Sequence, residues 1–305
     1  MPSGYVIVEG PGFTPLPYGL ISVAGPQTPG DRHWYQGVQF QPDVCAAALS
    51  LTTICVTGLG ATGTPVTGVP SVAAEPFRVY ALIECAPVGQ GNDMERLRTR
   101  AEAALTDGEA RALEHVVWTG NAGNGVVRPH LAEDTAVLGT AQGALAISLQ
   151  TAATVLNSGT AMDVVEAFGS LEGALAACYG GVGVIHVPRA AVPHLANKNL
   201  CQVRGGQLVT YNGNLVAAYS PGDRTNPAGS DPAAGTTYFY ATGAVSIWRS
   251  PTIEVGVGTP DFLDRETNTV AFMAYRYYAA AWECCHIGAL VSLGGDISGT
   301  QGVAT

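Results

Sequence analysis

The sequence predicts an α+β protein with few helices and many strands. Three observations support this class. Residues 92–118 are dense in charge and have the period of a long helix, and residues 163–179 have the period of a shorter one. Most of the remaining chain consists of short strand-forming runs separated by glycine and proline.

The first 70 residues are predicted to extend away from a core. Residues 1–30 are rich in proline and glycine, which favours an extended arm that gains order only from a neighbour. Residues 38–70 alternate strand-like runs with a tip of glycine, threonine and proline. We therefore interpret them as a long protruding hairpin or loop.

A strand predicted at residues 76–85 leads directly into the long helix. Within residues 92–118, apolar side chains recur at spacings of three, four and seven, which places them on one narrow stripe among ten charged residues. Gly120 follows the last periodic residue and predicts the helix end. Residues 106–109 fit either a new capping box or a kink, and the sequence leaves both open.

A loop and a second helix are predicted next. Residues 121–133 are rich in glycine and asparagine, which is typical of a loop. The helix at residues 163–179 stops at Gly180-Gly181, and a buried strand follows at residues 182–187. The buried face of this helix is predicted to consist of Val164, Val165, Phe168, Leu171 and Leu175.

The last third of the chain is predicted to be rich in strands. Asn212-Gly213 stands between two apolar runs and predicts a β-hairpin over residues 208–216. Residues 237–248 and 269–293 contain further strand-forming runs.

Composition excludes several classes of function. The formal charge of -10 makes the molecule as a whole repel nucleic acid, so sequence-specific DNA or RNA binding is not expected. Lys198 is the only lysine, which leaves little for docking to an anionic membrane. The sequence lacks a signal-peptide pattern and any apolar run of about 18 residues, so we expect a soluble protein made in a cytoplasm.

The seven cysteines are scattered and lack the paired spacing of a zinc site. We expect them to be buried free thiols rather than disulfides. Cys284-Cys285-His286 is not a metal site, because adjacent residues of a strand point to opposite faces. The full set is Cys45, Cys55, Cys85, Cys178, Cys201, Cys284 and Cys285.

Two further motifs have ordinary explanations. Residues 120–125 resemble a phosphate-binding loop in their glycines, but they follow a helix and contain no lysine, so we interpret them as a loop. Asp261, Asp264 and Glu266 surround a bend and fit turn chemistry better than acid and base catalysis.

The best candidate for a nucleophile is Cys178, near a helix end, with His186 as its base. No aspartate or asparagine is placed to orient the histidine, and core packing explains both residues better. We therefore predict no catalytic, cofactor-binding or metal-binding residues and no cofactor. A chain of this length without such a site favours a structural role.

In the order of these elements, the chain resembles the major capsid protein of tailed double-stranded DNA phages, which has the Hong Kong 97-type fold. Residues 75–80 look like the strand at the base of that family's extended loop, and residues 111–120 look like the end of its spine helix. Residues 268–276 and 285–289 are similar to its final strands, where an arginine, here Arg276, precedes an apolar segment.

The resemblance implies a division of the chain into the parts of this fold. These parts are an N-arm at 1–30, an extended loop at 31–74, a peripheral domain at 75–144 with a spine helix at 92–118, an axial domain at 145–243, return strands of the peripheral domain at 244–284, and a C-terminal segment at 285–305.

The resemblance also implies a function without enzymatic activity, which is self-assembly through pentamers and hexamers into the icosahedral shell around a phage genome. Arm and extended loop would reach across neighbours, and each modest contact would be repeated many times. Implied partners are other copies of the chain, a separate scaffold or none, portal and decoration proteins, and packaged DNA held without sequence-specific contacts. The implied location is the virion capsid, assembled in the host cytoplasm without a membrane.

Two features found in some members are not expected. A protease removes an N-terminal scaffolding region in some, whereas this chain starts at Met1 with the arm. Others cross-link a lysine of the extended loop to an asparagine, but residues 31–74 contain no lysine, and Lys198 falls in the predicted axial domain.

Other functions stay open at this point. An encapsulin nanocompartment shell would share the same fold, although its extended loop is usually short. A cysteine hydrolase would use Cys178 and His186. A tail or adhesin protein is disfavoured by the long charged helix.

Overall fold

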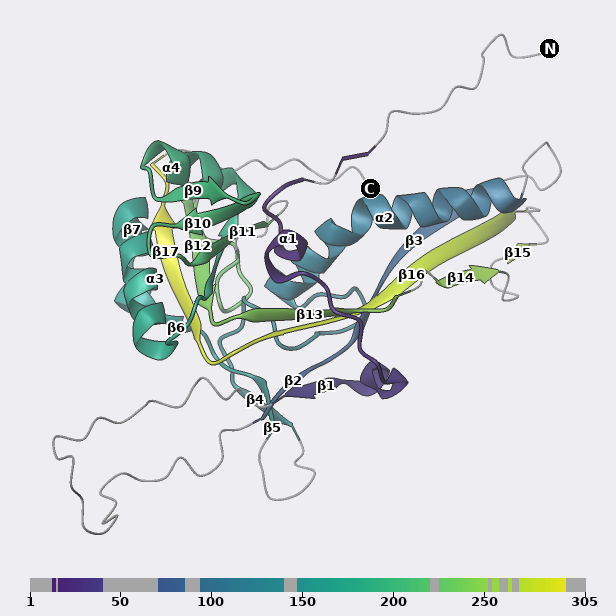
Figure 1. Cartoon of the computed structure of the whole chain (residues 1–305), viewed down its shortest axis with the longest axis horizontal. Helices are drawn as coiled ribbons and strands as arrows, with labels where there is room; N and C mark the ends of the chain where they lie inside the picture. Colours follow the sequence, from purple (N-terminus) through teal and green to yellow (C-terminus); the bar gives the residue numbers. More distant parts are fainter. Residues whose placement is uncertain are drawn as a thin grey trace, which may run out of the picture.

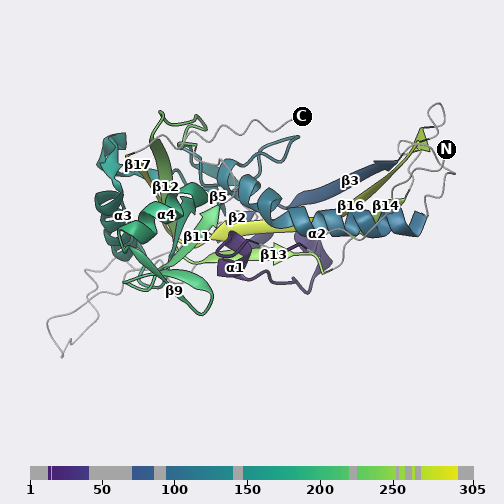
Figure 2. The ribbon, with the colours of Figure 1, turned by 90° about the horizontal axis from the view of Figure 1, so that it is seen from above.

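The structure of the chain is a computed structural model. It describes residues 13–14, 16–40, 71–85, 94–139, 147–219, 225–251, 254–257, 263–264 and 269–294. The molecule is elongated, with the long helix α2 (Met94–Thr119) lying along long strands at one end and a second sheet with helix α3 (Val164–Cys178) at the other (Figures 1 and 2). The mixture of helices and sheets confirms the predicted α+β class.

A five-stranded antiparallel sheet, here called the peripheral sheet, carries α2. At its centre is β16 (Thr269–Trp282), and each of the other described strands of this sheet pairs with β16. These partners are β3 (Phe77–Cys85), β13 (Val245–Arg249), β14 (Glu254–Val257) and β15 (Leu263–Asp264). Alternate side chains of the strands, such as Val79 and Phe272, are buried in the core with α2. On the opposite face, Ala279 and Ala281 of β16 are buried in a third core, whereas Tyr80 and Leu82 of β3 are exposed.

Helix α2 buries one stripe of apolar side chains, as its period predicts. Leu97, Leu105 and Leu113 are each at most 4% exposed and pack in the same core as the peripheral strands. The helix continues through residues 106–109, so no new helix begins there. It ends before Gly120, whose φ of 73° is the left-handed conformation expected of a C-terminal glycine.

An eight-stranded mixed sheet, here called the axial sheet, forms the other end of the molecule (Figure 1). Helix α3 packs on one face of it and fills the second core. In spatial order the strands are β6 (Thr154–Val155), β17 (His286–Ser292), β12 (Thr236–Thr242), β8 (Val184–Pro188), β11 (Leu215–Tyr219), β10 (Gln207–Thr210) and β9 (Cys201–Arg204), with β7 (Met162–Asp163) also paired to β17.

The predicted unit of helix, glycine turn and buried strand is present as α3 and β8. The side chain of Asp163 caps α3 by accepting hydrogen bonds from the amides of Val165 at 2.8 Å and Glu166 at 3.2 Å. The predicted buried face is confirmed except for Val165, which is 46% exposed. Val165 lies about 100° around the helix from Val164, and Ala167 occupies the buried position instead.

The predicted β-hairpin is also present. Strands β10 and β11 pair antiparallel, with Leu208 opposite Val216. Gly213 at the turn has a φ of 94°, a conformation that glycine adopts without strain.

A small four-stranded sheet lies beside the peripheral sheet. Its order is β1 (Val38–Phe40), β2 (Ser71–Ala74), β5 (Ile147–Gln150) and β4 (Val137–Gly139). Because β1 and β2 pair antiparallel, the two ends of the hairpin predicted over residues 38–70 lie together. The predicted tip of this hairpin lies outside the described residues.

The described part of residues 1–30 packs on its own chain, so the expectation that this stretch gains order only from a neighbour is wrong for that part. It forms the short helix α1 (Leu20–Ala24), in which Leu20 is fully buried. The amide of Ala218 donates to the carbonyl oxygen of Tyr18 at 2.8 Å. Leu20 in this segment therefore packs within the same chain, although the first twelve residues lie outside the described part.

The remaining helical elements are short. They are η1 (Arg32–Gln36), η3 (Leu156–Gly159), η4 (Arg189–Ala191) and α4 (Val192–Asn197).

Candidate functional site

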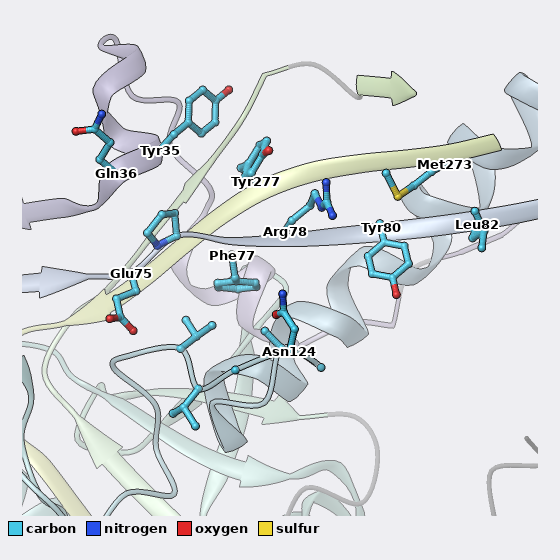
Figure 3. A pocket seen from close by; sticks show the side chains of 16 residues that line it. Tyr35, Gln36, Glu75, Phe77, Arg78, Tyr80, Leu82, Asn124, Met273 and Tyr277 are labelled. Atoms are coloured by element: carbon cyan, nitrogen blue, oxygen red, sulfur yellow. The ribbon is translucent and has the colours of Figure 1, made fainter. Parts of the chain in front are cut away.

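An open groove of about 1020 Å³ runs along the face of the peripheral sheet that points away from α2. Strands β3 and β16 form its floor (Figure 3). Tyr35 and Gln36 of η1 lie at one end, and the loop that follows α2, including Asn124, lies along one side. The groove is therefore built from four segments that are separated in the sequence, η1, β3, the loop after α2 and β16.

The floor consists of cross-strand pairs whose side chains share the open face. Tyr80 is 58% exposed and Leu82 is 49% exposed, which is high for large side chains on strands that also line a core. The pairs are Leu82 with Met273, Tyr80 with Tyr275, and Arg78 with Tyr277.

Ring contacts hold the polar end of this surface in place. The guanidinium carbon of Arg78 lies 5.2 Å from the centre of the Tyr275 ring, a cation–π distance. The Tyr35 ring lies 4.7 Å from the Tyr277 ring, so η1 is packed against β16. The groove is thus an aromatic and aliphatic surface with one positioned cation.

This chemistry suits a contact between proteins. Tyrosine, methionine and arginine are enriched in the centres of protein interfaces, where they lose water on binding. Leu82 is already about half buried, so burying the rest of it would contribute about 1 kcal/mol, roughly half of the value for a fully exposed leucine. A surface that is exposed, apolar and already ordered therefore favours binding of an apolar protein segment.

Behind the groove, a buried carboxylate fixes α2 to the peripheral sheet, and sequence reasoning missed it. Glu109 is 6% exposed and accepts hydrogen bonds from Nη1 of Arg276 at 2.8 Å to each carboxylate oxygen. It also accepts from the hydroxyl of Tyr278 at 2.7 Å and from Nη1 of Arg249 at 3.4 Å. Burial, together with the charge of Glu109, raises the pKa of Tyr278 well above its ordinary value.

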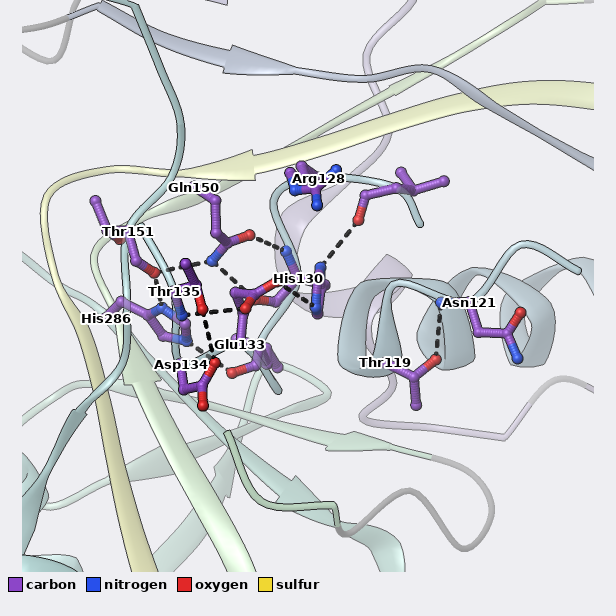
Figure 4. Close-up of polar contacts among 12 residues, drawn as sticks. Thr119, Asn121, Arg128, His130, Glu133, Asp134, Thr135, Gln150, Thr151 and His286 are labelled. Atoms are coloured by element: carbon purple, nitrogen blue, oxygen red, sulfur yellow. Dashed lines mark hydrogen bonds and ion pairs between the residues drawn. The ribbon is translucent and has the colours of Figure 1, made fainter. Parts of the chain in front are cut away.

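Three buried histidines, here called the histidine cluster, lie where the C-terminal end of α2 meets the axial sheet. His186 is 0% exposed, and His130 and His286 are each 4% exposed. Figure 4 shows His286 between two loops: its Nδ1 lies 2.7 Å from the carbonyl oxygen of Thr151 and its Nε2 lies 2.8 Å from that of Leu131. Carbonyl oxygens only accept, so both of these contacts are hydrogen bonds only when both ring nitrogens of His286 carry protons.

His130 lies beside Glu133, whose charge also acts on His286. Its Nδ1 lies 3.0 Å from the carbonyl oxygen of Val127, and its Nε2 lies 3.4 Å from Oε2 of Glu133. Burial lowers the pKa of His130, and the charge of Glu133 opposes this effect. Burial also lowers the pKa of His286, against the opposing hydrogen bonds to the two carbonyl oxygens.

His186 is a satisfied core histidine, as the sequence suggested. Its Nε2 lies 2.9 Å from Oγ1 of Thr242, and its Nδ1 lies 2.9 Å from the hydroxyl of Tyr219. Because the Thr242 hydroxyl donates to the carbonyl oxygen of Gly243, it accepts from His186, so Nε2 carries the proton. Burial, with a smaller effect from His286, lowers the pKa of His186 to about 3.

The structure does not bring Cys178 and His186 together as a catalytic pair. Sγ of Cys178 is bonded to Sγ of Cys285, and both ring nitrogens of His186 are engaged in the core. A cysteine in a disulfide has no thiolate to act as a nucleophile. The hypothesis of a hydrolase built on these two residues is therefore wrong.

The expectation of free thiols is also wrong for several cysteines. Cys178, Cys284 and Cys285 are disulfide-bonded, whereas Cys201 is free. The sequence hides the pairing because Cys178 and Cys285 are 107 residues apart, and only the packing of α3 against β17 brings their Cα atoms to 6.0 Å. Cys45 and Cys55 lie outside the described residues.

The other motifs considered in the sequence do not form a binding or catalytic site in the described part of the chain. Residues 120–125 form a loop after α2, with Asn121 bridged to Val126, as predicted. Asp261 and Glu266 lie outside the described residues.

In the described part of the chain, no group of three or more histidine, cysteine or acidic residues is placed to hold a metal ion. Among the described helices, none is both long and apolar enough to span a membrane.

Comparison with solved structures gives matches over nearly the whole chain. The capsid of an empty GTA particle is 12% identical, covers 95% of this chain and 94% of its own, and has a TM-score of 0.53. The capsid of a native GTA particle is 13% identical, covers 95% and 96%, and has a TM-score of 0.51. The capsid of Ralstonia phage GP4 is 12% identical, covers 95% and 96%, and has a TM-score of 0.49.

Sequence comparison gives no such match. No protein-family model matches the chain, and no curated protein is similar to it in sequence at a significant level. The likeness is thus one of fold, and it covers nearly the whole of this chain.

Proposed function

We propose that this chain, which has the Hong Kong 97-type capsid fold, is a major capsid protein that self-assembles into the icosahedral shell of a tailed double-stranded DNA phage. The observation that carries the proposal is the likeness to the capsid of the empty GTA particle over 95% of this chain and 94% of that chain. Because this likeness covers nearly the whole of both chains, it supports the proposal that this chain also forms a capsid. The role is structural and needs no enzymatic chemistry.

The parts of the fold take the following assignments in this proposal. They are an N-arm at 1–30, an extended loop at 31–74, a peripheral domain at 75–144 with its spine helix α2, an axial domain at 145–243, return strands at 244–284, and a C-terminal segment at 285–305.

The groove on the peripheral sheet supplies a contact between neighbouring copies. We infer that the extended loop of one copy enters the groove of the next. Between Gln41 and Pro70 the sequence has a single charged residue, Asp43, so this stretch can enter an apolar groove at the cost of burying at most one charge. Each contact of this kind is modest, and closed symmetry repeats it around every ring.

The partners in this proposal are other copies of the chain in pentamers and hexamers, together with portal and scaffold or decoration proteins and the packaged genome. The formal charge of -10 is consistent with a shell that encloses DNA without binding it tightly. The protein would be assembled in the cytoplasm of the bacterial host and would reside in the virion.

The first test is to express the chain and examine the size-exclusion fractions by negative-stain electron microscopy. Closed shells or capsomer rings are the expected result, with nucleic acid and co-purifying protein assayed in the same fraction. A specific cargo enzyme inside the shells would identify an encapsulin instead. A monomer of 31 kDa at every salt concentration tested would contradict the proposal.

A second test concerns the groove itself. Leu82→Asp and Tyr80→Asp place a charge on its floor, and we expect each to leave a folded subunit that no longer forms shells. Val203→Asp on β9 is a matched control, because Val203 is 57% exposed and lies on the axial sheet. Shell formation by Leu82→Asp as efficient as that of Val203→Asp would show that the groove is not the contact.

A further inference from the structure

The outer edge of β3 lies in the groove and has no strand beside it in the described part of the chain. Within the peripheral sheet, β3 pairs only with β16. In an antiparallel pair, about half of the backbone N–H and C=O groups of each strand point away from the partner strand. Along β3 these groups therefore face the side of the groove that is formed by the loop after α2 (Figure 3).

The loop after α2 meets the chain just before β3 and then leaves the edge of β3 free. The amide of Glu75 donates to the carbonyl oxygen of Arg128 at 2.8 Å, and Oε2 of Glu75 accepts from the amide of Arg128 at 2.9 Å. Farther along, the loop closes on itself, because the amide of Val127 donates to the carbonyl oxygen of Gly120 at 2.8 Å. Among the described residues, no backbone hydrogen bond joins this loop to residues 77–83.

The edge of β3 lacks the features by which proteins usually block the addition of a strand. Edge strands that stay unpaired in soluble proteins are typically short, bulged, or marked by lysine or proline. In contrast, β3 is nine residues long, contains no proline, glycine or lysine, and pairs with β16 without a bulge. Its charged residues are Arg78 and Glu84, and Arg78 is held over the ring of Tyr275. A long and regular edge of this kind favours pairing with a further strand.

The open face of β3 offers contacts for the side chains of such a strand. Tyr80 and Leu82 are 58% and 49% exposed and point into the groove. A strand added beside β3 would place every second side chain over the groove, next to these two residues. Main-chain hydrogen bonds would then supply affinity, and the alternate side chains would supply specificity.

The sequence contains a segment that fits this edge, at residues 51–57 of the predicted extended loop. The segment reads Leu-Thr-Thr-Ile-Cys-Val-Thr, in which five of the seven residues are β-branched. It has no proline, glycine or charged residue, so it can pair in an apolar groove without burying a charge. These residues lie outside the described part of the chain.

The direction in which the extended loop leaves the subunit points to a neighbouring copy. Phe40, at the end of β1, pairs with Val72, whereas Val38 pairs with Ala74. The loop therefore starts from the end of the β1–β2 pair that is farther from β3, which begins three residues after Ala74. An extended chain can place Thr57 up to about 55 Å from Phe40, which is far enough to reach an adjacent subunit.

We propose that residues 51–57 of one copy add as a further strand to the outer edge of β3 in the next copy. This contact rests on the proposed function, because it specifies how the extended loop binds in the groove. Main-chain hydrogen bonds to β3 hold the segment, and Tyr80 and Leu82 contact its side chains.

Hydrogen exchange resolved to single amides tests the added strand, compared between assembled shells and dissociated subunits. In residues 77–83, every second amide is bonded to β16, and we expect the others to exchange about tenfold or more slowly in shells. The amide of Leu171 in α3, whose side chain is fully buried, is the internal reference. Docking of side chains alone would give no alternation and would overturn the proposal. Equal protection in dissociated subunits would also overturn it, because the edge would then be covered by its own chain.

Proline substitutions identify the added segment. Adjacent residues of a strand present their amides to opposite sides, so at least one of Thr53→Pro and Ile54→Pro removes a hydrogen bond to β3. We expect that variant to form no shells, or shells without alternating protection. Thr53→Ala keeps its amide and Ala61→Pro lies outside the segment, so both controls should assemble as the unchanged chain does. Alternating protection that persists in both proline variants would show that another segment, such as residues 1–12, pairs with β3.

These outcomes separate failure of the contact from failure of the proposed function. Shells without alternating protection of β3 refute the contact and leave the capsid role standing. If the chain forms no shells, the capsid role fails, and a synthetic peptide of residues 49–59 with Cys55→Ser is added to the subunits. Alternating protection with this peptide, but not with a peptide that also carries Thr53→Pro and Ile54→Pro, would support pairing at the edge of β3. Absence of protection would refute it.

Discussion

Replacing Glu109 with glutamine tests how strongly α2 is held on the peripheral sheet. Three of the contacts that Glu109 makes are at 2.7–2.8 Å, to Arg276 and Tyr278, and the side chain of Arg276 is only 14% exposed. Removing one partner of a buried ion pair typically costs about 3–5 kcal/mol, because the other charge stays buried without compensation. The contact with Arg249, which is 34% exposed, adds less than about 1 kcal/mol.

We therefore expect Glu109→Gln to lower the free energy of unfolding by about 3 kcal/mol, the low end of that range, since glutamine keeps the shape and one acceptor oxygen. The double variant Glu109→Leu with Arg276→Met should recover most of the loss, because it removes both charges together. Glu102→Gln is the matched control on the same helix. Its ion pair with Arg98, at 3.2 Å, is exposed and should contribute less than about 1 kcal/mol.

The measurement is urea unfolding of dissociated subunits, together with hydrogen exchange of α2 to localise the loss. Glu109→Gln should lower protection along the helix from Leu97 to Leu113. The reasoning would be refuted if Glu109→Gln were no more destabilising than Glu102→Gln, or if the double variant were as unstable as Glu109→Gln.

Three further predictions concern stability. Reduction breaks the Cys178–Cys285 disulfide together with the disulfide of Cys284. It should lower the unfolding free energy by at least about 4–5 kcal/mol, the value that the chain-entropy description gives for the loop of 107 residues between Cys178 and Cys285, measured as a shift of the urea midpoint with and without reductant. Gly120→Ala should lower the free energy of unfolding by about 2 kcal/mol or more, as measured by thermal unfolding. Gly120 has a φ of 73°, and an added Cβ would lie 2.6 Å from Nδ1 of His130. Asp163→Ala should lower the free energy of unfolding by about 1 kcal/mol, because the N-terminal cap of α3 is lost. Asp163→Asn keeps a capping oxygen and should retain most of the stability in the same assay.

Each of these has a result that would contradict it. A reduced chain with an unchanged urea midpoint would show that the disulfide does not constrain the unfolded state. A melting temperature of Gly120→Ala equal to that of the unchanged protein would mean that His130 moves aside at no cost. Equal stability of Asp163→Ala and Asp163→Asn would remove the cap as the cause.

Helices and turns that are determined by neighbouring residues in the sequence could be predicted. The period of α2, the glycine after it, and the Asn212-Gly213 turn are local features, and the structure has each of them within one or two residues. The sequence did contain a signal for the buried carboxylate behind the groove. Glu109 stands four residues from both Leu105 and Leu113, which places a charged residue on the apolar stripe of α2.

The rest depends on contacts between distant residues. The disulfide joins segments that only the tertiary fold brings together, and α1 is ordered by strands more than 190 residues later in the chain. The groove was hidden for a similar reason. Tyr80 and Leu82 follow an ordinary strand pattern, and nothing in the sequence says that the second face of their sheet stays uncovered.

The position of β16 has a consequence for the time at which the subunit becomes competent to fold. Every described strand of the peripheral sheet pairs with β16, yet β16 is the second-to-last described strand along the chain. While the ribosome is still making earlier segments, β3, β13, β14 and β15 have no partner, and α2 has no complete surface to pack on. Because Met273 and Tyr277 come from the same late strand, the groove cannot exist on a nascent chain before β16 has been made. Until then, a nascent chain lacks the groove that we propose as the contact between copies.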